Sequence, residues 1–245
     1  MMTVRSLKKR IGQDKVPVLR NVNMHIDKGE FIGIIGSVGS GKTTLLRCLS
    51  GRETWDDGDI SYKGESIKSF SLWKKYIYRK ECAFLAEQPD LHRHRTASKN
   101  VLSGRFRRSG LWKLATGLVS KDEHYTAHDY LDKVGLLDRA HLKVEHLSGG
   151  EKQRVAIGKA LAWGAKVIFA DEPVSGLDPQ SAARVMEDFK RLCKEEELTV
   201  ICCLNNIELA EKYCSRILGL AEGEIKIDVS RRRLTSREKQ QILGD

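Results

Sequence analysis

The sequence predicts an α/β fold built on a mostly parallel sheet, with an antiparallel β part beside it and an inserted helical lobe. Short apolar runs rich in β-branched residues alternate along the chain with longer segments of helical character. Near the N-terminus, apolar and polar residues alternate one by one, as in strands with one solvated face. Residues 91–147 contain no strong strand pattern, which indicates that this stretch is a helical insertion.

Five apolar runs are interpreted as buried strands because they are too short for helices. They are residues 31–36, 82–86, 167–171, 198–204 and 216–220. Helices are expected between them, at 42–50, 150–163 and 180–196. Strands that alternate with helices in this way form a parallel sheet covered on both faces.

The other segments complete a single domain over residues 1–245. Residues 18–26 and 58–64 have the alternation expected of antiparallel strands. Within the insertion, residues 123–137 have helical character, and residues 230–245 are expected to form a short solvated helix without an assigned function.

This organisation divides the domain into a core and an insertion. The core with its β part is expected to comprise residues 1–90 and 148–245, and the helical subdomain residues 91–147.

Composition narrows the class of protein. Forty per cent hydrophobic residues are enough for a substantial core, and the net charge of +10 favours an anionic partner such as a nucleotide, a nucleic acid or a membrane surface. No apolar run approaches the ~20 residues of a membrane helix, and the start lacks a signal-peptide core. The six cysteines form no CxxC pair and are interpreted as core residues of a cytosolic protein.

Residues 36–43, GSVGSGKT, fit the phosphate-binding pattern GxxxxGK[ST] between an apolar strand and a helix. Glycines let the backbone turn its N–H groups towards an anion, and the N-terminus of the following helix adds partial positive charge. Lys42 would contact the β- and γ-phosphates, Thr43 would bind Mg²⁺, and Thr44 can reach a phosphate oxygen. The predicted nucleotide-binding residues are Gly36, Ser37, Val38, Gly39, Ser40, Gly41, Lys42, Thr43 and Thr44.

Two carboxylates follow the strand at 167–171, in the sequence VIFADEP. Asp171 would hold the Mg²⁺ shell, and Glu172 would accept a proton from the attacking water. A strand that ends in Asp-Glu is weak evidence alone, but together with the phosphate-binding loop it predicts nucleotide hydrolysis.

A second turn of small residues, LSGGE at 147–151, precedes the helix 150–163. It predicts a second anion site at a helix N-terminus. Two such sites in one chain make sense if two copies meet head to tail, each closing on the ATP of the other. Asp178, in SGLD at 175–178, would then lie at the junction, and the residues that reach the partner's ATP would be Ser148, Gly149, Gly150 and Glu151.

These motifs, in this order, resemble the ATP-binding-cassette (ABC) ATPases over nearly the whole chain. The resemblance implies a P-loop NTPase with a RecA-like sheet core, an antiparallel β-subdomain, an inserted helical subdomain and a nucleotide-sandwich homodimer with ATP and Mg²⁺. A narrower match resembles the phosphonate-import ATPases. It lies in residues 100–113, 130–150, 181–186 and 209–220.

The narrower resemblance implies a function. The chain would energise uptake of phosphonate or a related oxyanion at the cytoplasmic face of the cell membrane. Its partners would be membrane permease subunits and an external solute-binding protein that acts through the permease.

Three positions depart from the pattern of the family. The strand at 198–204 is followed by Asn205 where the family has a histidine near the γ-phosphate. Glu87 aligns with the family's glutamine near the metal, although a shift of one residue would place Gln88 there. A carboxylate at Glu87 could still bind Mg²⁺ but would add negative charge beside the γ-phosphate. Ile11 aligns with an aromatic residue that stacks on adenine. An amide cannot carry the charge of a protonated imidazole. We therefore expect this chain to bind MgATP but to hydrolyse it slowly.

Other classes of function stay open at this point. One is a soluble ABC protein of translation or DNA repair, although the single cassette without a coiled-coil insertion argues against it. Another is a non-transport subunit of a phosphonate-processing complex, with weak or no hydrolysis. Nucleic-acid binding is not expected, because the basic stretch 91–121, with eight Lys or Arg residues and no acid, holds only Phe106 and Trp112 as aromatics.

The basic stretch is expected to contact the permease or the membrane face. Replacing Arg105, Arg107 and Arg108 with glutamate would then uncouple transport while ATP binding stays intact.

Overall fold

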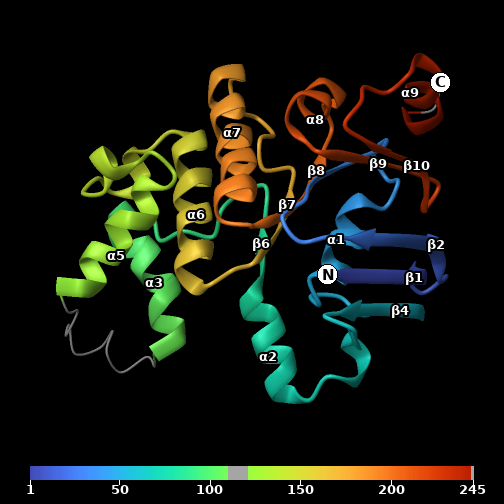
Figure 1. The fold of residues 1–245 in the computed structure, drawn as a ribbon, viewed down its shortest axis with the longest axis horizontal. Coiled ribbons are helices and arrows are strands. Elements are labelled where there is room, and N and C mark those ends of the chain that lie inside the picture. Colours follow the sequence, from blue (N-terminus) through green and yellow to red (C-terminus); the bar gives the residue numbers. More distant parts are fainter. Residues whose placement is uncertain (110–120, 244–245) are drawn as a thin grey trace.

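A computed structural model describes residues 1–109 and 121–243, and its centre is a six-stranded sheet in the order β10-β9-β3-β8-β7-β6 (Figure 1). Strands β6, β7, β8, β3 and β9 run parallel, and β10 pairs antiparallel with β9 at one edge. The five predicted strands are all present. The strands of this sheet are β3 (Phe31–Ile35), β6 (Cys82–Leu85), β7 (Val167–Asp171), β8 (Thr199–Leu204), β9 (Arg216–Ala221) and β10 (Glu224–Ser230).

A second, antiparallel sheet lies beside the first in the order β2-β1-β4-β5. Its strands are β1 (Met2–Ile11), β2 (Val16–Ile26), β4 (Asp57–Tyr62) and β5 (Glu65–Ser66). Strand β1 was not predicted, because its apolar alternation is interrupted. The register shifts near Ser6, which has a φ of 47°, and a Cβ on the adjacent Gly58 would lie 2.3 Å from the Ser6 carbonyl oxygen. An irregularity of this kind moves apolar residues out of the simple two-residue period.

Helices cover both faces of the six-stranded sheet (Figure 1). None of the helices in residues 1–109 and 121–243 has the length and apolar character to span a bilayer. The helices are α1 (Lys42–Leu49), α2 (Leu72–Glu81), α3 (Ala97–Ser109), α5 (Lys121–Asp132), α6 (Gly149–Trp163), α7 (Pro179–Glu195), α8 (Ile207–Tyr213), α9 (Ser236–Leu243), and the short 3₁₀ helices η1 (Ile67–Ser69), η2 (Leu137–Arg139) and η3 (Val144–His146).

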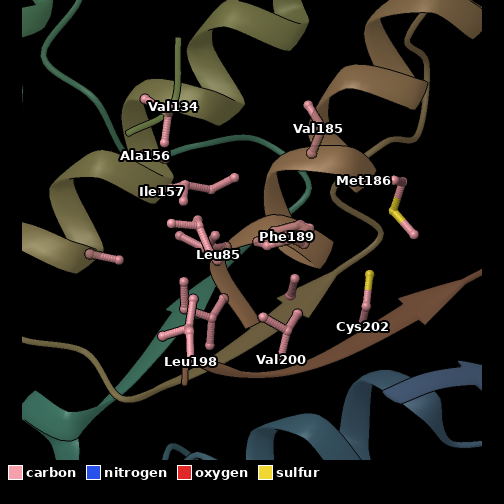
Figure 2. Close-up of a cluster of buried hydrophobic side chains, with 14 of the residues drawn as sticks. Leu85, Val134, Ala156, Ile157, Val185, Met186, Phe189, Leu198, Val200 and Cys202 are labelled. Atoms are coloured by element: carbon pink, nitrogen blue, oxygen red, sulfur yellow. The ribbon is translucent and has the colours of Figure 1, made fainter. Parts of the chain in front are cut away.

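Two hydrophobic clusters lie on opposite faces of the six-stranded sheet. Along β8, Cys202 belongs to the cluster under α6 and α7, and Cys203 to the cluster under α1 and the antiparallel sheet. Figure 2 shows the first cluster, in which Ile157 from α6 and Phe189 from α7 lie over Leu85 and Val200 of the sheet. Alternation across the strands therefore gives the sheet two buried faces.

The insertion is attached to the core through α6, against which α3 and α5 both pack. Its two ends run side by side, with a bridge between Thr96 and Lys143. On this basis we propose that residues 91–147 form a separate helical subdomain. The helix expected at 123–137 ends at Asp132, because Gly135 takes a φ of 57° and a Cβ there would lie 2.5 Å from a guanidinium nitrogen of Arg154.

The prediction for Arg105, Arg107 and Arg108 falls on side chains outside the described residues and stays a prediction.

The C-terminal segment is docked and not simply solvated, which corrects the expectation from sequence. Ile242 of α9 is 1% exposed, and Leu234 is also buried. Gly219 of β9 makes room for this packing, since a Cβ there would lie 2.5 Å from Cγ1 of Ile242. The helix therefore covers part of the core at β9.

All six cysteines are free thiols, five of them buried and Cys214 half-buried. Burial raises the pKa of Cys48 and Cys193 to about 12, and it raises the pKa of the other four well above the ordinary value. These thiols behave as small core residues, as their positions in apolar segments predicted.

Candidate nucleotide-binding site

The loop between β3 and α1 wraps so tightly that two of its positions require glycine. A Cβ on Gly36 would lie 2.2 Å from the carbonyl oxygen of Leu220 and 2.5 Å from Oγ of Ser40. Gly41 directly precedes α1 and has a φ of 103°, in the left-handed region where a side chain is strained. Close packing against β9 and the turn into α1 thus explain both glycines.

Lys42 lies inside the loop and contacts its backbone. Its side chain is almost fully buried, and its ammonium donates hydrogen bonds to the carbonyl oxygens of Gly36 at 2.8 Å and Ser37 at 3.1 Å. The hydroxyl of Ser40 is buried nearby and has no hydrogen-bond partner among the described residues. A buried cation and an unpaired hydroxyl at a helix N-terminus suit an incoming phosphate.

Thr43 and Asp171 bring the loop and the end of β7 together. The hydroxyl of Thr43 donates a hydrogen bond to the Asp171 carboxylate at 3.0 Å across 128 positions of sequence. Burial raises the pKa of Asp171, the negative charge of Glu172 adds to the rise, and the bond from Thr43 opposes it. A hydroxyl beside a carboxylate is a donor set that hard cations such as Mg²⁺ prefer, so these two residues fit the predicted metal role.

Glu172 is the first residue after β7 and has an unusual backbone. Its φ is 49°, and its N–H donates to the carbonyl oxygen of Cys203 at 3.2 Å. A left-handed conformation in a residue other than glycine costs roughly 1–3 kcal/mol and is concentrated at functional positions. The chain therefore holds this carboxylate in a strained turn directly after Asp171, which with Thr43 fits the predicted Mg²⁺ site.

The predicted second anion site lies at the N-terminus of α6, where Ser148 and Glu151 form a capping box. The Ser148 hydroxyl accepts from the Glu151 N–H at 3.2 Å, and the Glu151 carboxylate accepts from the Ser148 N–H at 2.8 Å. In this chain alone, Glu151 therefore stabilises the start of the helix. Its contact with a partner's ATP stays a prediction.

Gly149 and Gly150 have a packing role that the sequence did not indicate. A Cβ on Gly149 would lie 2.7 Å from Cδ2 of Leu177, and one on Gly150 would lie 2.8 Å from Cβ of Ser181. The glycines therefore let the loop at 175–178 and the start of α7 approach α6 closely. The LSGGE turn at 147–151 and the SGLD loop at 175–178 therefore form one surface.

Asp178 is the N-cap of α7 and lies exposed on that surface. Its carboxylate accepts from the Ser181 N–H at 2.9 Å, and Pro179 begins the helix. Hydrogen bonding to Ser181 lowers the pKa of Asp178. The residue is thus held charged at the helix start, while its place at a dimer junction stays a prediction.

The three departures from the family pattern lie at exposed positions. Asn205 follows β8 directly, and its neighbour Asn206 caps α8 by accepting from the Leu209 N–H at 3.0 Å. Ile11 ends β1 opposite Val16 and is 43% exposed. Val38, at the tip of the phosphate-binding loop, is exposed as well.

Glu87 has an exposed side chain but an anchored backbone. Its carbonyl oxygen accepts from the side-chain amide of Gln153, a buried residue of α6, at 2.6 Å. Sequence reasoning missed Gln153. The available signal was a neutral polar residue that falls on the buried face of α6.

Fold and site together define a nucleotide-binding P-loop protein: a glycine-rich loop around a buried lysine after β3, and two carboxylates at the end of β7, with β8 between these strands. The family model described as "ABC transporter" matches residues 19–175, and the chain belongs to that family. The carboxylates and the LSGGE turn lie within the matched residues.

Curated relatives are similar in sequence to this chain over most of its length. A protein of Lactococcus lactis subsp. cremoris (strain SK11), "Phosphonates import ATP-binding protein PhnC", is 39% identical over 218 residues, covering 86% of this chain and 85% of its own. A protein of the same name from Mesoplasma florum is 36% identical and covers 93% of both chains.

Solved structures agree in fold. A dimeric post-hydrolysis state of the ATP-binding cassette MJ0796 bound to ADP and Pi has a TM-score of 0.80, with 28% identity over 96% of this chain and 100% of the other. The cassette is thus the architecture of this chain.

Proposed function

We propose that this chain is the ATP-binding and ATP-hydrolysing subunit of an ABC importer for phosphonate or a related oxyanion. The observation that carries the ATPase part is the contact between Thr43 and Asp171, which joins the phosphate-binding loop to the strand that bears Glu172. The solute rests on the names of the relatives. As in the sequence-based expectation, the chain would act at the cytoplasmic face of the membrane, with permease subunits and an external solute-binding protein.

The residues of the site suit hydrolysis of a γ-phosphate. Lys42 and the loop N–H groups would bind the phosphates, and Thr43 with Asp171 would hold Mg²⁺, which supplies positive charge to the phosphate oxygens when bound. Glu172 would accept a proton as the water oxygen bonds to phosphorus and the bond to the β–γ bridging oxygen breaks, giving ADP and phosphate. Asn205 would lie near the γ-phosphate, Glu87 would lie near the Mg²⁺ as a further possible ligand, and Ile11 would lie near the adenine.

A homodimer would complete two such sites. Ser148 and Gly149 lie exposed and Gly150 lies buried at the start of α6, next to the loop with Asp178. In a head-to-tail pair this surface would face the phosphate-binding loop of the partner. The dimeric relative bound to ADP and Pi supports this arrangement. The alternative, a non-transport subunit, is not favoured, because the relatives are named as import proteins.

Reconstitution tests the transport function. The chain should be co-expressed with phosphonate permease subunits of the same organism, placed in proteoliposomes with the binding protein, and supplied with radiolabelled methylphosphonate. We expect uptake that requires enclosed ATP and that disappears with Lys42→Met. Purification with soluble phosphonate-cleaving enzymes and no ATP-dependent uptake would favour the non-transport alternative.

Replacing Asn205 with histidine is expected to raise steady-state ATP turnover about tenfold or more, because a positioned imidazole adds proton-transfer and charge stabilisation that an amide lacks. Malachite-green phosphate release at saturating MgATP measures this. Asn205→Gln retains the amide and serves as the control. If histidine brings no increase over glutamine, Asn205 does not limit turnover.

A further inference from the structure

Helix α2 exposes an unusual number of large apolar side chains. Leu72 is 88% exposed and Trp73 69%, and Tyr76 and Ile77 also lie open to solvent. Trp73 and Tyr76 stack with ring centroids 5.6 Å apart. Single exposed apolar residues are normal, but four within six positions form a patch of the kind that marks an interaction surface.

The geometry of α2 turns this patch away from the protein. Tyr78 is the buried residue of the helix, and its hydroxyl donates to the carbonyl oxygen of Leu49. At about 100° per residue, Trp73 and Tyr76 fall on the side of the helix opposite Tyr78, and Ile77 lies beside them. Figure 1 shows α2 at one end of the molecule, far from α9. The apolar side chains are therefore outward-facing and do not form part of the core.

Cations lie within the patch and at its edge. Lys74 pairs with Glu65, and the only acid of the helix, Glu81, is paired with Lys63 and Lys166. Among the described residues, the structure gives no acidic partner for the three other basic side chains of the helix. These are Lys75, Arg79 and Lys80.

At about 100° per residue, Lys80 falls between Trp73 and Tyr76, and Arg79, which donates to the Gly51 carbonyl oxygen, falls at the Leu72 edge of the patch, whereas Lys75 falls nearer Tyr78. The α2 surface is defined as Leu72, Trp73, Tyr76 and Ile77 with Arg79 and Lys80.

We propose that the α2 surface binds the interfacial region of a membrane that contains anionic lipids. Trp and Tyr favour the headgroup level of a bilayer, leucine and isoleucine enter its acyl boundary, and lysines extend their charges to the headgroups. Each cation near such a surface strengthens binding by a factor of about five. The chain would thus touch lipid directly, in addition to any contact with a permease.

Charge favours lipid over the other possible occupants. A second copy docked face to face would bring Arg79 and Lys80 against their own equivalents, which repel. A protein segment would have to supply carboxylates for two cations within and beside an apolar patch. An anionic bilayer supplies both negative charge and apolar depth without a specific partner sequence.

Vesicle flotation with the purified full chain tests the proposal. We expect binding to phosphatidylcholine vesicles that contain phosphatidylglycerol, weaker binding to phosphatidylcholine alone, and a decline as salt is raised. Arg79→Glu with Lys80→Glu should lower the partition coefficient at least about 25-fold, from two factors of five. Leu72→Ser with Trp73→Ser should weaken binding at equal charge.

Matched variants separate this surface from general effects. Lys190→Glu with Lys194→Glu changes the same charge on exposed residues of α7, and Leu137→Ser removes an exposed leucine elsewhere; both should bind as the wild type does. ATP turnover without vesicles should stay unchanged in every variant, so that the result does not depend on the ATPase proposal. Equal binding to both vesicle types, or wild-type binding by the α2 variants, overturns the proposal. So does an α2-dependent complex with the permease in detergent when no vesicle binding is found.

Discussion

Replacing Glu172 with glutamine is expected to lower kcat for ATP hydrolysis by roughly 10²–10⁴-fold, the usual contribution of a positioned general base. The amide keeps the shape of the side chain but cannot accept the proton from water. MgATP binding should persist, because Lys42, Thr43 and Asp171 are intact. With hydrolysis blocked, the ATP-bound pair should accumulate, and light scattering should report twice the monomer mass only when MgATP is present.

Glu222→Gln provides a matched control for this experiment. Glu222 also has a positive φ, of 52°, but lies exposed in the turn between β9 and β10. Its variant should hydrolyse ATP at the wild-type rate. Wild-type turnover in Glu172→Gln would show that another group accepts the proton. If Glu172→Gln stays a monomer at saturating MgATP, the proposed head-to-tail dimer is wrong.

Replacing Gly36 with alanine is expected to weaken ATP binding about 100-fold or more. The new Cβ would meet the Leu220 carbonyl oxygen at 2.2 Å, and because that atom belongs to the backbone of β9, the loop has to move instead. Movement of the loop misplaces its N–H groups. Losing one or two charge-assisted hydrogen bonds of roughly 1.5–3 kcal/mol each accounts for this loss of affinity. Isothermal titration calorimetry with ATP measures the change.

Gly39→Ala in the same loop distinguishes crowding from general disturbance. Gly39 has a φ of 82°, and a Cβ there would meet nothing within 4 Å. Its substitution therefore adds only the strain of a left-handed residue, about 1–2 kcal/mol. We expect a modest fall in Tm and an ATP affinity close to wild type. Equal loss of affinity in both variants would contradict the role given to the contact with β9.

The parallel sheet could be predicted because each of its buried strands is a local signal. Phe31–Ile35 and Val167–Asp171 are short, apolar and bounded by polar or glycine residues. Helix α2 and strand β1 were missed for the opposite reason. In α2 the apolar residues face solvent, so their spacing does not mark a core face, and β1 is interrupted at Ser6. Tertiary context decided both elements.

The candidate site divides in the same way. The loop around Lys42 lies within eight residues of sequence, and its pattern follows from the need to surround a phosphate. Contacts between distant segments had no such signal. The hydrogen bond from Gln153 to Glu87 joins positions 66 apart, and the approach of Gly149 to Leu177 depends on how α6 meets the loop before α7. Such contacts require the folded chain.

Five of the six thiols are buried and Cys214 is half-buried, which makes this protein well suited to site-specific labelling. Maleimides react with thiolates, and a raised pKa together with burial leaves Cys48, Cys193 and the other native cysteines almost without that form at neutral pH. A cysteine introduced at an exposed position such as Tyr76 would then be almost the only thiol that reacts with a maleimide fluorophore. A probe placed there could follow the environment of α2 in real time without first removing any native cysteine.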